Sequence, residues 1–213
     1  MTDQGKPRID PRKIRTRLLL KDAFIDLLQE MDIGKISVNR IAERSGINRV
    51  TFYLHYHDIS DMMEKMADDM EDDIRYVLKQ LPVDNKISML DFDMINLVNL
   101  LEHIAANAKF YKTILSSKQT SIFTERLLKI LTEMIASRIE QGAGTSNRII
   151  SASGAPKDIA IWYGSAALIG TIVQWLRNDI PYTPLFLAQN FSALTRRNYM
   201  VQDNNLAFPV AET

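Results

Sequence analysis

The chain contains no cysteine, only three histidines, eight glycines and seven prolines among its 213 residues. Without cysteine it has no disulfide framework, no thiolate zinc site and no thiol nucleophile. Residues 1–13, MTDQGKPRIDPRK, hold no apolar run of the kind that a secretory signal requires. We therefore expect a cytoplasmic protein that has no cofactor and no bound metal.

The chain also lacks net charge, because 26 Lys and Arg residues balance 26 Asp and Glu residues. The balance is uneven along the chain. Residues 1–57 hold eleven basic and seven acidic residues, a local charge of +4, whereas residues 58–80 hold three and eight, a local charge of −5. A basic segment followed by an acidic one indicates two functional parts with different partners.

Hydrophobic residues make up 46% of the chain, enough for a substantial core. Apolar residues recur every three or four positions, as in amphipathic helices, and we found no alternating strand pattern. The expected helices are 12–31, two short helices within 37–56, 58–81, 84–106, 109–116, 120–141, 156–179 and 184–197. In the first of them, one broad face including Ile14 and Leu18 should be buried. The sequence thus predicts an all-α fold.

The segment 34–61, GKISVNRIAERSGINRVTFYLHYHDISD, carries the functional information. Ser37 can cap a short helix that ends at Gly46, a residue that readily adopts a left-handed turn. Asn48 can cap a second short helix in which Phe52 and Tyr56 pack into the core. Two such helices joined by a tight turn predict a helix-turn-helix.

The pattern Ser-Val-x-x-Ile-Ala-x-x-x-Gly-Ile-x-x-x-Thr-Phe-Tyr-x-His-Tyr, residues 37–56, resembles the tetracycline-repressor (TetR) family of bacterial transcriptional regulators. The resemblance covers residues 12–65, and a weaker likeness to the regulatory half of Gram-positive members continues beyond. It implies an N-terminal three-helix DNA-binding domain, residues 1–57, and a larger helical ligand-binding and dimerisation domain, residues 58–213, which begins with a connecting helix, 58–80. It further implies a homodimer that binds a double-stranded DNA operator and acts as a repressor released by a small-molecule effector.

The resemblance also assigns roles to individual residues. Arg49, Val50 and Asn39 would face base edges, while Thr51 and Tyr53 would contact phosphates. Arginine can pair with guanine, asparagine with adenine, and valine can pack on the thymine methyl group. The full set of expected DNA-binding residues is Ser37, Asn39, Arg40, Asn48, Arg49, Val50, Thr51, Tyr53 and His55. The family usually has lysine at the position of Ile59, where it contacts a phosphate, so that contact is missing here.

His55 and His57 could be considered as metal ligands. Two residues separated by two positions point to different sides of a helix, however, and the sequence shows no third ligand nearby. A metal site is therefore not expected.

Residues 159–176 form a run of eighteen without a charge, which is long enough to test as a membrane span. Polar residues within the run and charged residues on both sides favour a soluble helix buried on most sides, so no membrane partner is expected. Small residues in this run allow a second helix to approach closely. By resemblance, this helix and the next form the dimer interface, through Ala160, Gly164, Ala167, Gly170, Trp175, Leu185, Phe191 and Leu194.

Several residues of the second half are candidates to line a ligand pocket. They are Phe92, His103, Phe110, Tyr111, Phe123, Met134 and Trp162. Taken one by one, ordinary helical core explains these residues better than a pocket does. Two alternatives for the whole chain stay open: an activator with the same fold that a partner protein controls, and a helical enzyme. The enzyme would have to rely on carboxylates alone, because the sequence has neither a paired-histidine motif nor a glycine-rich phosphate loop, so no enzyme is expected.

Overall fold

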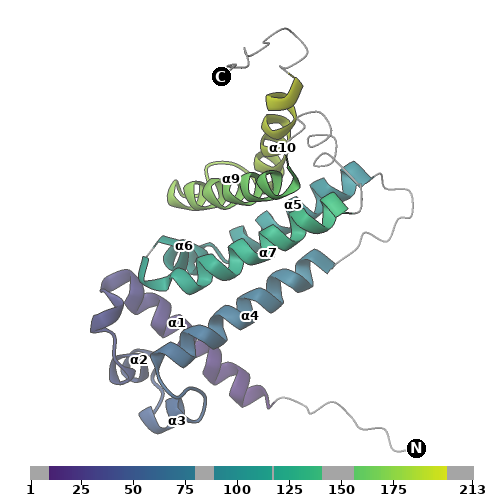
Figure 1. Cartoon of the computed structure of the whole chain (residues 1–213). Helices are drawn as coiled ribbons and strands as arrows, with labels where there is room; N and C mark the ends of the chain where they lie inside the picture. Colours follow the sequence, from purple (N-terminus) through teal and green to yellow (C-terminus); the bar gives the residue numbers. More distant parts are fainter. Residues whose placement is uncertain (1–9, 80–88, 117, 141–155, 201–213) are drawn as a thin grey trace, which may run out of the picture. The chain divides into compact units, whose positions relative to one another are not determined.

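The computed structural model describes residues 10–79, 89–116, 118–140 and 156–200. Within these ranges the chain forms nine α-helices and no strand, which confirms the expected all-α fold (Figure 1). The helices are α1 (Pro11–Glu30), α2 (Val38–Ser45), α3 (Arg49–Tyr53), α4 (Ile59–Lys79), α5 (Met89–Ala106), α6 (Ala108–Ser116), α7 (Ser121–Glu140), α9 (Lys157–Arg177) and α10 (Pro184–Met200). Short 3-10 turns occur at Ile33–Lys35 and Lys118–Thr120. The expected start of the fifth helix, residues 84–88, lies outside the described residues.

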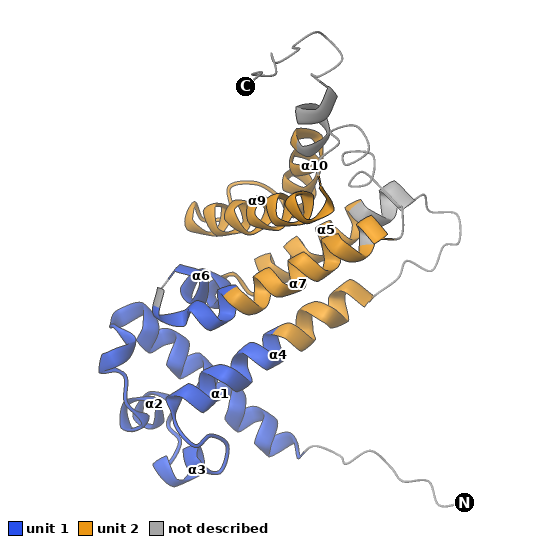
Figure 2. Ribbon diagram, viewed as in Figure 1, with its two compact units in different colours: residues 1–70, 109–124 blue, residues 71–108, 125–213 orange. Residues whose placement is uncertain are grey.

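The helices belong to two compact units (Figure 2). Unit 1 comprises residues 1–70 and 109–124, and unit 2 comprises residues 71–108 and 125–213. The expected domain boundary after residue 57 precedes α4, whereas the boundary between the compact units falls within α4, after Met70. Helix α4 therefore contributes residues to both units.

Helix α1 of unit 1 is buried only in its second half. Asp10 caps its start by accepting a hydrogen bond from the Arg12 amide at 2.9 Å, and Pro11 occupies the first turn. Leu20 and Phe24 are fully buried, but Ile14 and Leu18 are 46% and 54% exposed. The expectation of one continuous buried face was wrong for the first half, because periodicity does not show how far the packing partners extend along a helix.

Helix α6 and the turn that follows it are tied to the second half of α1 within unit 1. Lys109 forms an ion pair with Asp26 at 2.5 Å, and the Gln29 amide donates a hydrogen bond to the Thr113 hydroxyl at 3.0 Å. The Gln119 side-chain oxygen accepts a hydrogen bond from the Ile33 amide at 3.2 Å. These contacts explain why a segment far along the chain joins the N-terminal unit.

The core of unit 2 is built from α5, α7, α9 and α10, with α10 packed against α5. Leu100 and Leu131 are fully buried, and Trp175 is 3% exposed with its indole N–H donating to the Tyr182 carbonyl at 2.9 Å. A Cβ atom at Gly164 would lie 3.3 Å from the Ile135 side chain. Glycine at this position therefore allows α9 to approach α7 closely.

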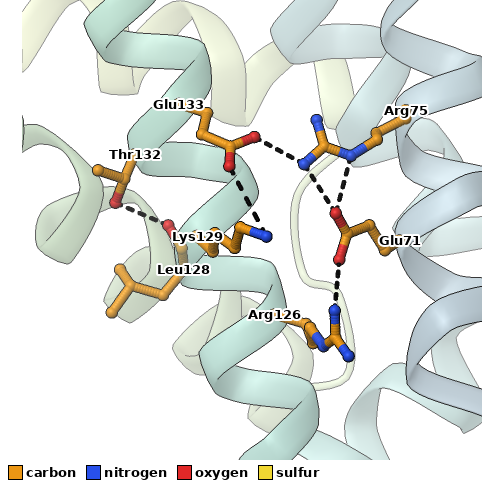
Figure 3. Close-up of polar contacts among 7 residues, drawn as sticks. All are labelled: Glu71, Arg75, Arg126, Leu128, Lys129, Thr132 and Glu133. Carbon is orange, nitrogen blue, oxygen red and sulfur yellow. Dashed lines mark hydrogen bonds and ion pairs between the residues drawn. The ribbon is translucent and has the colours of Figure 1, made fainter. Parts of the chain in front are cut away.

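An ion-pair network joins the second half of α4 to α7 within unit 2 (Figure 3). The Glu71 carboxylate lies between two guanidinium groups, 2.7 Å from Arg75 and 3.2 Å from Arg126. Arg75 also contacts Glu133 at 2.6 Å, and Lys129 lies 4.0 Å from the same carboxylate. The Glu71 side chain is only 13% exposed, so water screens its contacts less than those of a surface pair.

The turn between α2 and α3 provides a first test of the fold. Gly46 has a φ of +65°, and its amide donates to the Ala42 and Glu43 carbonyls that end α2. We expect Gly46→Ala to lower the free energy of unfolding by about 1–2 kcal/mol, because an L-residue is strained in this conformation. Nothing lies within 4 Å of the added Cβ, so the cost is that of the backbone alone. Urea unfolding measures it.

Gly34→Ala is the matched control, because it also adds a Cβ with nothing within 4 Å but at a glycine without positive φ. It should leave stability unchanged or raise it slightly. An equal loss in both variants would contradict the assignment of strain to Gly46.

The ion-pair network provides a second test, through its dependence on pH. Contacts with Arg75, then with Lys129 and Arg126, hold the pKa of the Glu71 carboxyl below its usual value of 4.5. A lowered pKa in the folded state stabilises the protein above the unfolded-state pKa, and this contribution disappears as the pH falls through the folded-state pKa. The free energy of unfolding of wild type should therefore exceed that of Glu71→Gln by about 1–2 kcal/mol at pH 7. This figure lies between the contributions that exposed and buried ion pairs make to stability.

The difference between wild type and Glu71→Gln should shrink steadily below about pH 4.5. Unfolding measured in urea at a series of pH values gives this difference. Glu125→Gln, at an exposed glutamate on α7, is the control and should show a small difference at every pH. A difference for Glu71→Gln that is independent of pH would contradict the electrostatic explanation.

Candidate nucleic-acid interface

Helix α3 is held in place by two aromatic side chains. Phe52 is fully buried and Tyr56 is 2% exposed, and their rings lie 5.5 Å apart. This confirms the expectation that both residues pack into the core of the N-terminal unit. One side of α3 faces the core, and Arg49, Val50 and Tyr53 are exposed, while Thr51 is half-buried.

The caps of the two short helices are formed as the sequence predicted. The Ser37 hydroxyl accepts a hydrogen bond from the Arg40 amide at 3.4 Å, and the Asn48 side-chain oxygen accepts one from the Val50 amide at 2.8 Å. Gly46 ends α2 in a left-handed conformation. The segment 37–56 is thus a helix-turn-helix in which both helices begin at side-chain caps.

The nine expected DNA-binding residues lie on or beside this motif. Seven are exposed and two, Thr51 and His55, are half-buried. The exposed residues are Ser37, Asn39, Arg40, Asn48, Arg49, Val50 and Tyr53. Their role in binding DNA stays a prediction, although their exposure leaves them accessible to it.

Arg49 and Tyr53 form a pair on the exposed side of α3. The Arg49 guanidinium donates a hydrogen bond to the Tyr53 hydroxyl at 3.2 Å and lies 5.5 Å from the centre of its ring. Residues four apart on a helix lie on the same face, which makes this contact possible. The pair restricts the orientation of the guanidinium group before any ligand is bound.

Two arginines of the basic N-terminal segment are engaged in ion pairs within unit 1. Arg44 binds Glu30 through both guanidinium nitrogens, at 2.7 and 2.6 Å, which lowers the pKa of the Glu30 carboxyl. Arg17 lies 2.7 Å from Asp69 of α4. The exposed positive charge is therefore smaller than the count of basic residues suggests.

The end of α3 is joined to α4 by Lys65. Its ammonium group donates to the His55 carbonyl at 3.1 Å and to the Asp61 carboxylate at 2.9 Å. Partial burial, reinforced by the positive charges of Arg17, Lys13 and Lys65, lowers the pKa of His55 below its usual 6.5. The imidazole is therefore uncharged at neutral pH.

In the described part of the chain, no three His, Asp or Glu side chains converge as a metal site.

Leu54 is the residue that sequence reasoning missed. It follows the last residue of α3 and is 77% exposed, and Val50, four positions earlier, is 69% exposed. The spacing from Val50 was the available signal. From the sequence alone, a leucine between Tyr53 and His55 is expected to be one more buried core residue.

The seven candidate ligand-pocket residues do not lie together in one unit. Three of them form an aromatic cluster in unit 1 around Phe110. The centre of its ring lies 5.3 Å from that of Tyr111 and 5.9 Å from that of Phe123. His103, Met134 and Trp162 belong to unit 2, and Trp162 is 62% exposed. The side chain of Phe92 lies outside the described residues. The expected pocket stays a prediction.

The eight candidate dimer-interface residues also differ in their surroundings. Trp175 is buried by its own chain and Gly164 faces Ile135, whereas Leu185 and Leu194 are 50% and 64% exposed. The positions 160, 167 and 191 are half-buried, and position 170 is exposed. The interface stays a prediction, and among these residues the leucines of α10 offer the most apolar surface for it.

Helix α9 is long and apolar enough to cross a membrane by length and composition. Only 28% of its most apolar stretch is buried, so the expectation that this helix is buried on most sides was wrong. Ile159, Trp162 and Tyr163 are each at least 49% exposed. A run without charges thus carries a buried face and an exposed apolar face.

Comparisons with known proteins agree with this geometry. Residues 92–197 match the family TetR_C_8, described as the transcriptional regulator C-terminal region. A stretch of 64 residues is 40% identical to the uncharacterized HTH-type transcriptional regulator YxbF of Bacillus subtilis. That stretch is 30% of this chain and 17% of the relative, so the match spans less than a fifth of the relative's length.

Solved structures of TetR-type regulators have the same fold. The TetR transcriptional regulator from Streptococcus agalactiae has a TM-score of 0.59 at 22% identity, covering 86% of this chain and 95% of that one. FadR from Bacillus subtilis, solved in complex with stearoyl-CoA, has a TM-score of 0.58 at 17% identity, covering 84% and 96%. These solved structures share the fold, and the matched C-terminal region at residues 92–197, together with the stretch shared with the HTH-type relative, shows that the chain belongs to the TetR family of transcriptional regulators, which is not a family of enzymes.

Proposed function

We propose that this regulator is a cytoplasmic homodimeric repressor that binds a palindromic DNA operator and releases it when a small molecule binds. The DNA-binding domain would be residues 1–57 and the regulatory domain residues 58–213. The observation that carries this proposal is the Arg49–Tyr53 pair, displayed on a helix that the buried Phe52 and Tyr56 hold in place.

The exposed side of α3 suits the major groove of DNA. A guanidinium group that is already oriented can donate two hydrogen bonds to guanine, whose edge offers two acceptors in the major groove. The hydroxyl groups of Tyr53 and Thr51, and that of Ser37, suit phosphate oxygens, which position a protein on DNA without reading its sequence. The Ser37 and Asn48 caps and the turn at Gly46 hold these groups in fixed positions relative to one another.

A dimer follows from the small size of the reading helix. Five residues of α3 reach too few base pairs for specific recognition, whereas paired half-sites about 34 Å apart double the contact. Exposed apolar side chains on α9 and α10 supply a surface for a second copy. They are Ile159, Trp162, Tyr163, Leu185, Phe186 and Leu194.

An unpartnered polar atom supports an effector site in unit 2. Among the described residues, the Asn96 side-chain oxygen of α5 is buried and has no hydrogen-bond partner. A buried acceptor without a partner costs about 1–3 kcal/mol, and a ligand with an N–H or O–H group would remove that cost. The solved FadR relative binds stearoyl-CoA, which makes acyl-CoA esters a suitable first set of probes.

Helix α4 is the proposed connection between ligand and DNA, because it contributes residues to both units. A ligand that binds one arrangement of α4 more tightly shifts the population towards that arrangement. The distance between the two DNA-binding domains of the dimer then changes. The ion pairs of Glu71 and Arg75 with α7 hold the second half of α4 to the rest of unit 2.

Selection of operators from random double-stranded DNA tests the DNA-binding proposal. The enriched sequence should be an inverted repeat if the protein binds as a dimer, and single half-sites would contradict the dimer. A reporter gene placed behind the selected operator should be less active with the protein than without it. Higher activity would indicate an activator instead.

Arg49→Ala should weaken operator binding by about 1–3 kcal/mol and should abolish the preference for one base in each half-site. Titrations against operators changed one base pair at a time measure both effects. Arg177→Ala, at an exposed arginine of α9, is the control and should bind like wild type. An equal loss on every sequence would show that Arg49 contacts only phosphate.

Stearoyl-CoA and esters of shorter chain, added to the operator complex, should release the DNA at a concentration that depends on chain length. Asn96→Leu should raise the concentration needed about tenfold, because the ligand loses one hydrogen bond. Asn99→Leu, at a half-buried asparagine of the same helix, is the control and should respond like wild type. Operator binding that no ester changes would contradict this class of effector.

A further inference from the structure

Two large apolar side chains, four residues apart, are exposed on the helix-turn-helix. Val50 is 69% exposed and Leu54 is 77% exposed. Leu54 has φ −74° and ψ −17°, so the helical backbone continues through it, and the amides of His55 and Tyr56 both donate to the Phe52 carbonyl. Residues four apart therefore share a face here.

Packing within the described part of the chain does not account for this pair. The core-facing side of the segment is occupied by Phe52 and Tyr56, which are 0% and 2% exposed. Leu54 and Val50 instead lie beside the Arg49–Tyr53 pair, in a segment whose sequence carries a local charge of +4. An apolar pair beside the exposed guanidinium group of Arg49 fits a partner that is anionic but presents apolar groups at one place.

Double-stranded DNA has these properties, because the 5-methyl group of thymine projects into the major groove between the phosphate backbones. We infer that Val50 and Leu54 together select thymine in each operator half-site by packing on its methyl groups. The inference rests on the proposed binding of DNA through α3 and adds Leu54 as a residue that determines base preference.

The spacing limits where these thymines lie. Side chains four apart on a helix are separated by about 5–6 Å at their Cβ atoms, and successive base pairs rise about 3.4 Å. Val50 and Leu54 therefore address thymines no more than about two steps apart.

Replacement of thymine by deoxyuridine removes only the methyl group and leaves the hydrogen-bonding edges unchanged. In the selected operator, deoxyuridine at each contacted thymine should raise Kd about fourfold, the effect of exposing about one methyl group. Leu54→Ala should bind the unmodified operator more weakly and lose its sensitivity to deoxyuridine at one position. Val50→Ala should lose it at the other. Fluorescence anisotropy titrations with labelled duplexes measure each Kd.

Leu128→Ala is the matched control, because Leu128 is an exposed leucine on α7. This variant should keep the full wild-type sensitivity to deoxyuridine. Thermal unfolding of Val50→Ala and Leu54→Ala should match wild type, since both side chains are more than two thirds exposed, whereas Leu128→Ala, at a side chain 37% exposed, should lose some stability.

The outcomes separate this inference from the proposed function. One outcome is enrichment of a specific operator whose Kd does not change when deoxyuridine replaces thymine at any position. That result would overturn the inference that Val50 and Leu54 contact thymine methyl groups, while the proposed recognition of DNA would stand. A deoxyuridine effect that persists in Leu54→Ala and Val50→Ala would assign the methyl contacts to other residues. If no sequence is enriched from random DNA, both the inference and the proposed function fail.

Discussion

The exposed side of α3, which is proposed to contact DNA, depends on the burial of Phe52 and Tyr56. Helix α3 has only five residues, and a helix of that length has no stability of its own in water because nucleation costs more than so few hydrogen bonds return. The two rings pack against each other in the core of unit 1 and fix the helix there. Every group that α3 displays, from Arg49 to Leu54, is positioned by that packing.

Ion pairs distribute the charge of this molecule in ways that the neutral total conceals. Arg17 is paired with Asp69 and Arg44 with Glu30, so part of the basic N-terminal segment is neutralised by its own unit. Glu71, in the acidic segment, binds two arginines of unit 2. The acidic residues of α4 thus hold helices together as well as balancing charge, and Arg49 keeps a guanidinium group on the exposed surface.

Helix α9 shows how an uncharged run can serve two purposes. One face, with Leu168, Ile172 and Trp175, is buried in unit 2. The other face exposes Trp162 and Tyr163, although the run contains no charge that would mark it as a surface. Large exposed apolar patches commonly mark sites of association, and this face together with the exposed leucines of α10 is the surface on which the proposed dimer relies.

The sequence by itself determined the helices, their caps and the helix-turn-helix. These depend on local chemistry: a serine or asparagine that caps a helix, a glycine that allows a left-handed turn, and apolar residues repeated at helical spacing. Ser37, Gly46 and Asn48 all have the predicted roles, and α1, α4, α9 and α10 begin within one residue of the expected positions.

Only the tertiary structure decided which apolar residues are covered and which charges are paired. Ile14, Leu18 and Leu54 have the same character in the sequence as Leu20 and Phe52, but they are exposed because no partner of the described fold covers them. Likewise, the pairing of Arg44 with Glu30 and of Lys109 with Asp26 joins residues that are distant along the chain. Periodicity identifies a face of a helix, whereas burial of that face depends on neighbours that only the folded chain brings to it.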